Sequence, residues 1–314
     1  MKIIVLTLSL FSFLMCDGIS GVTYFKHSDG TFSLSRVYFT YKKTISDNLS
    51  FKFQTDVGQS SGEYEVYLKK AQLNWNFDES TSMSMGMIGM NLFNVQEKTW
   101  GNRFILKSAL DLFGWGPSAD LGIGFTKDFN NSVSASLLIT NGEGYKAHSS
   151  DINNESRYSL QIVAGEKRLD KNNGNNFGLV FSNVKHSEHE EEMIGLFSGF
   201  SKNDLRVGLE YFNLDYNYDN DNKDKLNLNS LYANYIVNEK MIAFIRLDEE
   251  EVEFSDLSIN NETLRNTGFI FNPTKGLSIS PNYFESKLKS YDNQGNLIDS
   301  SETDEFTLNF QFKI

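Results

Sequence analysis

The chain is dominated by short segments in which apolar and polar residues alternate. In the last segment, Phe306, Leu308, Phe310, Phe312 and Ile314 alternate with Thr307, Asn309, Gln311 and Lys313. Successive side chains of a β-strand point to opposite faces, so this pattern predicts a strand with one apolar and one polar face. Similar segments recur from about residue 20 onward. The predicted strands are 20–27, 32–44, 48–57, 63–77, 81–90, 118–127, 131–141, 156–166, 176–185, 191–200, 204–216, 225–237, 240–254, 262–272, 276–288 and 303–314.

One predicted strand, 63–77, changes its alternation halfway along. Its apolar residues are Tyr64, Val66 and Leu68 on one parity and Ala71, Leu73 and Trp75 on the other. An extra residue in one strand of a pair produces such a change, so we expect a β-bulge here.

The connectors between the predicted strands alternate between short and long. Every second connector is a tight turn rich in Asn, Asp, Gly or Pro, with 167–175 as the one longer member. The intervening connectors are mostly longer, as in outer-membrane barrels with short periplasmic turns and long external loops. We therefore predict an all-β fold, a 16-stranded antiparallel transmembrane β-barrel. Fourteen strands is the fallback, since the first and fourth strands are weak, and a secreted soluble β-protein is the alternative class.

The N-terminus has the features of an export signal. Lys2 precedes an uncharged, mostly apolar run from Ile3 to Met15, which is too short for a membrane-spanning helix. Cleavage is expected at a position between about 16 and 20, and it would remove Cys16, the only cysteine. The predicted organisation is a signal peptide at 1–20 and an outer-membrane barrel domain at 21–314, in a Gram-negative-type bacterium.

Composition is consistent with a barrel and excludes some partners. The mean hydropathy of −0.38 argues against a helical membrane protein but leaves a barrel open, because half of each barrel strand is polar. The 26 Phe and 14 Tyr suit interfacial girdles, and only 3 Pro suits long hydrogen-bonded ladders. A formal charge of −12 argues against nucleic acid as a partner.

The longest connector, 91–117, is the third long loop and differs in composition from an ordinary external loop. It combines many apolar residues with charged ones, a mixture that can pack on a barrel wall while presenting charge to water. We expect it to fold into the lumen. The alternatives are a folded external cap or two further strands.

Three motifs carry a resemblance to a known family. They are Arg36-Val37-Tyr38, the octapeptide 96–103 (Gln-Glu-Lys-Thr-Trp-Gly-Asn-Arg) and Ser118-Ala119-Asp120-Leu121-Gly122. Over roughly residues 20–145 the chain resembles bacterial outer-membrane porins, in particular the phosphate-selective porin O and P family. The resemblance implies a 16-stranded barrel, usually a homotrimer, whose third loop narrows the pore. The chain departs from that family in having no ladder of arginines and in ending on Ile314, where barrels usually end on an aromatic residue.

Strand parity and the resemblance together nominate residues at a pore constriction. A Lys or Arg on the lipid face near mid-membrane would cost about 2–4 kcal/mol, so the charges of the first strands should point inward. There they could select permeant ions, or pair with one another and fix the loop to the wall. The candidate pore-lining residues are Arg36, Tyr38, Lys52, Asp56, Glu97, Lys98, Trp100, Arg103 and Lys107.

We predict no metal site, cofactor or enzymatic activity. His186 and His189, beside Glu188 and Glu190, could form a weak metal site, but an exposed loop is the favoured interpretation. The acidic runs are interpreted as a solvated external rim. No nucleophile can be nominated beside any of the four histidines.

The predicted function is a porin with a water-filled channel for passive diffusion of small hydrophilic solutes or ions, constricted by 91–117 and embedded in outer-membrane lipid. A non-conducting structural or adhesive surface barrel is the alternative. A transporter of apolar compounds is a third hypothesis, suggested by Phe93, Phe104 and Phe113. The permeant solute and the sign of ion selectivity are left open.

Overall fold

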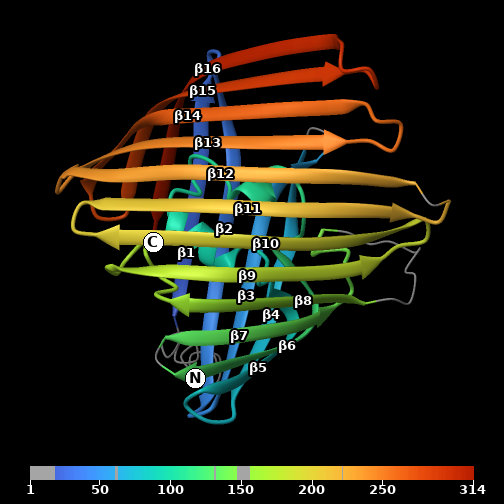
Figure 1. Cartoon of the computed structure of the whole chain (residues 1–314). Coiled ribbons are helices and arrows are strands. Elements are labelled where there is room, and N and C mark those ends of the chain that lie inside the picture. The colour runs from blue at the N-terminus through green and yellow to red at the C-terminus, as the bar shows by residue number, and fades with distance from the viewer. Residues whose placement is uncertain (1–17, 61–62, 131, 147–155, 221) are drawn as a thin grey trace.

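The computed structural model describes residues 18–60, 63–130, 132–146, 156–220 and 222–314. Within them, sixteen antiparallel strands form a closed barrel in which each strand pairs with its sequence neighbours (Figure 1). The strands are β1 (Ile19–Ser28), β2 (Thr31–Ser46), β3 (Leu49–Ser60), β4 (Glu63–Asn76), β5 (Thr81–Gly89), β6 (Ala119–Asn130), β7 (Val133–Thr140), β8 (Arg157–Gly165), β9 (Gly174–Lys185), β10 (His189–Lys202), β11 (Leu205–Tyr218), β12 (Lys223–Asn238), β13 (Met241–Glu253), β14 (Ile259–Thr274), β15 (Leu277–Tyr291) and β16 (Leu297–Lys313). The prediction of sixteen strands, and not the fallback of fourteen, is confirmed.

The barrel closes where its first and last strands meet. The backbone N–H of Gly21 donates to the Ile314 carbonyl at 3.1 Å, and the N–H of Ile314 donates to the Gly21 carbonyl at 3.0 Å. β1 and β16 then continue as an antiparallel pair from Val22 and Lys313. This seam leaves no free sheet edge, which is what a strand structure in lipid requires.

The two faces of the sheet have the predicted character. On β16, Phe306 and Phe312 are exposed on the outer surface, whereas Thr307, Asn309 and Gln311 are buried on the inner one. An outer surface of this kind suits lipid, since the exposed side chains are apolar and the polar ones are turned inward.

The predicted bulge in β4 is confirmed. Gln54 of β3 pairs with Lys70, and the next residue, Thr55, pairs with Leu68. Lys69 is therefore the extra residue, and the parity of the strand changes at it. As a result Lys69 and Lys70, although adjacent in sequence, both reach the interior and line one cavity.

The last strand starts earlier than predicted. β16 begins at Leu297, where the sequence predicts a start at 303, and its first residues pair with the end of β15. This part of the hairpin is highly exposed, and Lys287 pairs with Glu302 at 2.9 Å. A hairpin surrounded by water does not need an apolar face, which explains why alternation failed to reveal it.

The predicted signal peptide at 1–20 lies almost wholly outside the described residues, and β1 begins at Ile19. No helix in the described part of the chain has the length and apolar character needed to cross a bilayer.

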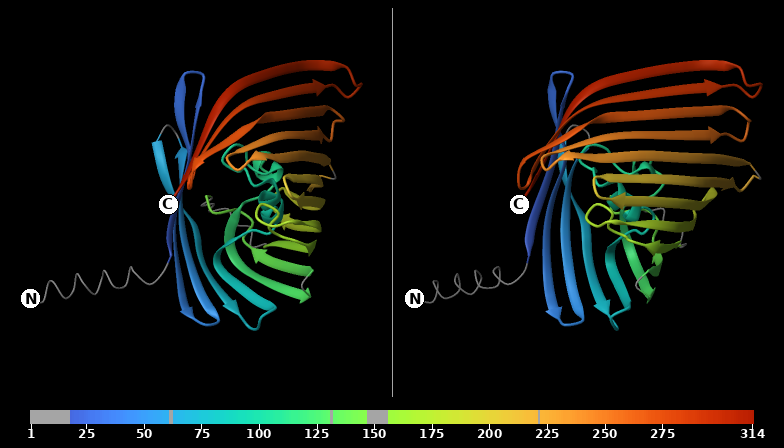
Figure 2. Two further views of the ribbon diagram at one scale, coloured as in Figure 1. Left: turned by 90° about the vertical axis from the view of Figure 1, so that its left-hand side faces the viewer. Right: turned by 60° about the vertical axis from the view of Figure 1, so that its left-hand side comes forward.

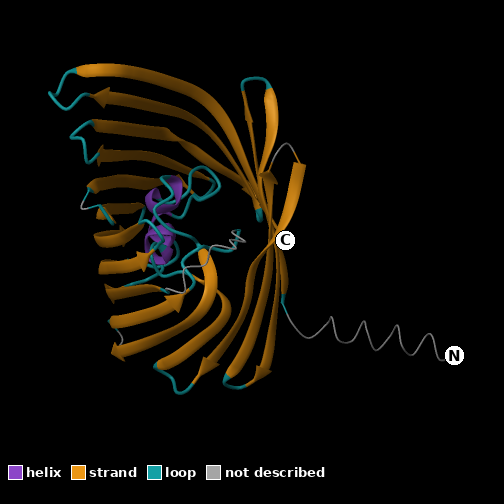
Figure 3. Cartoon of the chain, turned by 90° about the vertical axis from the view of Figure 1, so that its right-hand side faces the viewer, coloured by secondary structure: helices purple, strands orange, loops and turns teal. Residues whose placement is uncertain are grey.

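The connector between β5 and β6 contains two short helices rather than two further strands. They are α2 (Asn94–Trp100) and α3 (Ala109–Leu112). α2 packs against β10 and β11, and α3 packs against β12. Figures 2 and 3 show both helices inside the curve of the strands, as the prediction for 91–117 requires.

The interior wall beneath these helices carries an apolar cluster among buried polar side chains such as Glu210 and Ser230. Leu92, Val95 and Leu110 of the connector form one buried cluster with inward side chains of β8 to β12. The side chains of these strands in the cluster are Val163, Val180, Met193, Phe197, Phe212, Leu214 and Leu228, and Ile88 of β5 and Leu138 of β7 also belong to it. The connector is therefore held by a hydrophobic core inside the barrel, a feature that an open water-filled lumen would lack.

Candidate pore constriction

The C-terminus of α2 fits against the wall because residue 101 is glycine. Gly101 caps the helix in the left-handed region, with φ of 77°, and its N–H donates to the Glu97 carbonyl. A Cβ at this position would also lie 2.7 Å from the Arg206 guanidinium. Glycine therefore permits both the turn and the close approach of Arg206, which donates to the Trp100 carbonyl at 3.0 Å.

Polar side chains of the wall donate hydrogen bonds to backbone carbonyls along the connector. Gln161 donates to Asn91 at 2.5 Å, and Tyr232 donates to Gln96 at 3.3 Å. These bonds satisfy carbonyls that would otherwise be buried without partners. They fix the connector at several points along its length.

Arg246 of β13 makes the most extensive of these contacts. Its Nη1 donates to the Lys107 carbonyl at 2.6 Å, and its Nε donates to both carboxylate oxygens of Asp248, at 2.8 and 3.0 Å. The guanidinium carbon lies 5.1 Å from the Trp100 ring centroid. Arg246 and Asp248 are both almost fully buried, so each supplies the partner that the other needs in the protein interior.

Trp100 does not line the pore, contrary to its place among the predicted lining residues. Its side chain is completely buried, with ring contacts to Tyr232 and Phe244. Its indole N–H donates to the Leu106 carbonyl at 2.8 Å. A large aromatic side chain has most to gain from burial, and here it anchors the connector.

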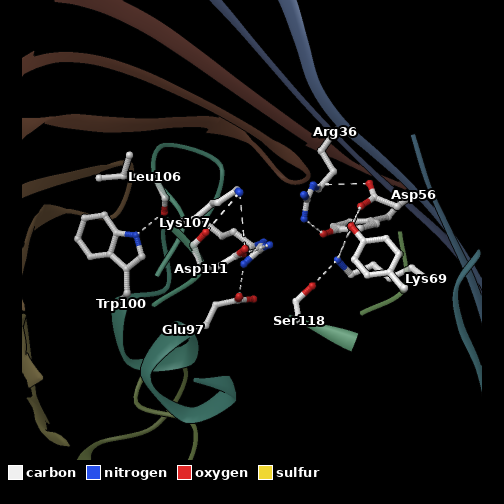
Figure 4. Close-up of polar contacts among 12 residues, drawn as sticks. Arg36, Asp56, Lys69, Glu97, Trp100, Leu106, Lys107, Asp111 and Ser118 are labelled. Carbon is white, nitrogen blue, oxygen red and sulfur yellow. Dashed lines mark hydrogen bonds and ion pairs between the residues drawn. The ribbon is translucent and has the colours of Figure 1, made fainter. Parts of the chain in front are cut away.

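The face of the connector turned away from this wall is charged. Arg103 forms ion pairs with Glu97 and with Asp111, the latter at 2.6 Å, and Lys107 lies 3.6 Å from Asp111. Figure 4 shows Glu97, Lys107 and Asp111 gathered on one side of the view. Burial acts to raise the pKa of Asp111, but the charges of Arg103 and Lys107 outweigh it and hold that pKa below its usual value.

A second charged group lies on the barrel wall of β2 to β4, on the other side of Figure 4. Asp56 is at its centre and is almost fully buried. It lies 3.5 Å from Arg36 and 3.7 Å from Lys69, and it accepts a 2.7 Å hydrogen bond from Tyr145. Arg36 in turn donates to the Tyr38 hydroxyl. Asp56 thus organises several side chains that face the connector.

The motif 118–122 positions part of this second group. Ser118 accepts a 2.9 Å hydrogen bond from Lys69. The Asp120 carboxylate accepts backbone hydrogen bonds from Gly142 at 2.6 Å and Gly144 at 3.2 Å. Through these bonds Asp120 holds the chain just before Tyr145 and directs that tyrosine toward Asp56.

Between the connector and the β2–β4 wall lies a cavity of about 500 Å³. Among the described residues, its ionisable lining side chains other than tyrosine are Lys52, Lys69, Lys70, Lys98 and Arg103, with Glu97 as the one acid. Polar side chains such as Gln54 and Gln72 complete the wall. The cavity therefore has a positive lining in a chain whose formal charge is −12.

Of the nine nominated residues, five line this cavity directly. They are Tyr38, Lys52, Glu97, Lys98 and Arg103. Arg36 and Asp56 lie in the network behind Tyr38, Lys107 pairs with Asp111 at the connector, and Trp100 is buried elsewhere.

Sequence reasoning missed Lys69 and Lys70 as lining residues. The predicted bulge was the signal that could have found them, because an extra residue allows two successive side chains to share a face. It also missed Tyr145 and Asp111, whose roles depend on contacts between distant segments.

The aromatic residues that suggested a path for apolar compounds pack in apolar clusters, and Phe93 also borders the cavity. Phe93 and Phe104 are each buried in an apolar cluster with the barrel interior. Phe113 packs against the first of these clusters. They are part of the connector's attachment to β8–β14.

Comparison with solved structures identifies the fold. OmpT, an outer-membrane protein of Vibrio cholerae, superposes with a TM-score of 0.68 at 11% identity, covering 95% of this chain and 97% of OmpT. A trimer form of OmpT gives 0.66 at 10% identity, with coverages of 95% and 99%. An anion-selective porin from Comamonas acidovorans gives 0.64 at 10% identity, again with 95% and 99%.

No protein-family model and no curated protein matches the sequence. The comparisons therefore do not confirm the narrower resemblance to the phosphate-selective porin O and P family. At identities this low the similarity concerns the fold alone, and the chain has the fold of bacterial outer-membrane porins.

Proposed function

We propose that this protein is a porin of the outer membrane of a Gram-negative-type bacterium, exported by a cleaved signal peptide. It forms a water-filled channel for passive diffusion of small hydrophilic solutes or ions. The observation that carries this proposal is the polar cavity between the connector 91–117 and the β2–β4 wall. One side of the connector is fixed to the barrel and the other leaves this space free for water and solute.

We further propose that the channel prefers anions. Five basic side chains and one acidic side chain line the cavity. Fixed charges at the narrowest part of a channel select ions more strongly than charges elsewhere on the protein, because they act at short range. The acidic runs 188–192, 215–224 and 248–253 contribute no described residue to the lining of this cavity.

Planar-bilayer recording tests both parts of the proposal. Stepwise conductance is expected, with a reversal potential in a salt gradient that has the sign of anion preference. Lys70→Gln should lower the anion-to-cation permeability ratio about tenfold, since a unit positive charge about 6 Å away in water favours an anion by about 0.7 kcal/mol and disfavours a cation by the same amount. Lys287→Gln is the matched control, because Lys287 pairs with Glu285 and Glu302 on β15 and β16.

Absence of conductance at every voltage would instead support a closed structural or adhesive barrel. Conductance with cation preference would support the proposed channel but contradict the proposal that the basic lining residues make it prefer anions. Unaltered conductance and selectivity in Arg36→Ala and Arg103→Ala would contradict the position of the constriction.

We also propose a homotrimer, by analogy with the trimer form of OmpT from Vibrio cholerae. Cross-linking in native membranes, followed by electrophoresis without heating, would distinguish a trimer from a monomer.

A further inference from the structure

A cluster of two histidines and one glutamate lies at the hairpin that joins β9 and β10. The ligand atoms of His186, His189 and Glu191 all lie within 4.8 Å of one another. The Nε2 atoms of His186 and His189 are 3.1 and 3.6 Å from the same Glu191 oxygen, Oε1. The sequence suggested Glu188 or Glu190 as the partner of these histidines, but the structure brings in Glu191.

Strand geometry explains this choice. His189 and Glu191 are two residues apart on β10 and share the inward parity of Met193 and Phe197, which are buried in the barrel. His186 follows β9 on the parity of the buried Val184. The backbone N–H of His186 donates to the His189 carbonyl at 2.8 Å, which holds the two rings side by side. Their centroids are 4.7 Å apart.

The spacing is that of ligands around one small ion. Zinc binds imidazole nitrogen and carboxylate oxygen at about 2.0–2.1 Å, which makes the edge of a tetrahedron about 3.3 Å. The two nitrogen–oxygen distances of 3.1 and 3.6 Å lie on either side of that value. Among the described residues, the solvent-shielded Nε2 of His186 has no hydrogen-bond partner, although Glu191 is near. Two atoms this close without a hydrogen bond between them are both available as ligands of a common ion.

The Glu191 carboxylate is also held in place by hydrogen bonding to a residue outside the cluster. Arg157 is buried and donates from Nη2 to Glu191 Oε2 at 2.9 Å, and its Nη1 donates to Ser182 at 3.0 Å. This leaves Oε1 directed at the two histidines. Outer partners of this kind orient metal ligands and are as much a part of a site as the ligands themselves.

We infer that His186, His189 and Glu191 form a binding site for a first-row transition metal ion, such as Zn²⁺, on the inner surface of the barrel at the β9–β10 end. Two imidazoles and one carboxylate favour such an ion over Mg²⁺ or Ca²⁺, which prefer oxygen ligands. Three protein ligands leave one coordination position for water or a solute.

Isothermal titration with zinc chloride alone tests the site, using the full barrel in detergent without a histidine tag. We expect one Zn²⁺ per chain and no comparable binding of Mg²⁺. His189→Asn and Glu191→Gln should each weaken Zn²⁺ binding by at least about tenfold. His27→Asn is the matched control, since the His27 ring packs against Phe32 and takes no part in the cluster.

Three results would overturn the inference. They are the absence of saturable Zn²⁺ binding, equal binding of Mg²⁺, and unchanged Zn²⁺ affinity in both cluster variants. Circular dichroism of each variant establishes that its barrel is folded. The readout is metal binding rather than current, so failure of this site would leave the proposed channel untouched.

Discussion

The inner surface of this barrel has two unlike halves. On β2 to β4 the inward side chains are polar or basic, and several of them line a cavity of about 500 Å³. On β8 to β12 the inward side chains at mid-strand are mainly apolar, and the connector 91–117 covers them. Both halves have an apolar outer surface. The outward face is therefore alike in both halves, whereas the character of the inward face differs with what lies against it.

This difference explains how the connector is positioned. Its apolar side chains pack on the apolar half, and its charged side chains are left facing the basic half. Burial of Leu92, Leu110 and Trp100 stabilises the folded connector without any covalent link to the wall. The position of the cavity is then a consequence of which half the connector covers.

The strongest test of this comparison removes the largest apolar anchor. Trp100→Ala should destabilise the packed connector by about 3–5 kcal/mol, because it leaves a cavity in a fully buried site. A loosened connector should also raise single-channel conductance and current noise. Urea unfolding from lipid and bilayer recording measure the two effects.

The control for that variant is Trp75→Ala, since Trp75 lies on the exposed outer surface. It should leave conductance unchanged. Wild-type conductance and stability in Trp100→Ala would show that the apolar half does not hold the connector.

A smaller effect is expected from the buried ion pair on β13. Arg246→Ala removes the hydrogen bond to the Lys107 carbonyl and leaves Asp248 buried without its counter-ion. The expected cost is roughly 3 kcal/mol, near the low end of the range for a broken buried pair.

The double variant Arg246→Ala with Asp248→Ala sharpens this test. It should recover part of the lost stability in urea unfolding, since no uncompensated charge remains. Strictly additive losses would indicate that the two side chains act independently.

The smallest effect concerns a turn at the end of the basic half. Side-chain and backbone hydrogen bonds from Ser80, with a further one from Thr81, lower the pKa of Asp78 from 3.8 to about 2. A lowered pKa means that the ionised carboxylate stabilises the β4–β5 turn above pH 3.8 and that this contribution is lost as the pH falls through about 2.

Carboxyl-carbon NMR titration can follow this ionisation directly. In Ser80→Ala the midpoint of Asp78 should move up toward 3.8, because the variant loses one of the bonds that favour the ionised form. A wild-type midpoint already near 3.8 would contradict the expected role of the turn.

Much of the fold could be predicted because alternation is a local property. The sixteen strands and the bulge in β4 follow from which residues stand two positions apart. The start of β16 at Leu297 could not be found in this way, since strands paired in water need no apolar face.

The site was less accessible to sequence reasoning because it depends on contacts between distant segments. Arg36 and Asp56 could be placed on the inner face by parity, but nothing local links Asp56 to Tyr145. Trp100 was placed on the correct connector and on the wrong side of it. The sequence held one signal that the connector packs on this side. Phe212 and Leu214 fall on the same parity as Arg206 and Glu210, so the inner face of this strand carries apolar side chains that must be buried by another segment.

The backbone hydrogen bonds between Gly21 and Ile314, which close the barrel, have a consequence for its assembly. Because the last strand completes the circle, a nascent polypeptide that ends before β16 would expose two unsatisfied edges, one on β1 and one on β15. Such edges are costly in hydrocarbon and attract other chains in water. Closure of the barrel therefore requires β16, and chains truncated before Leu297 should fail to form a stable closed barrel.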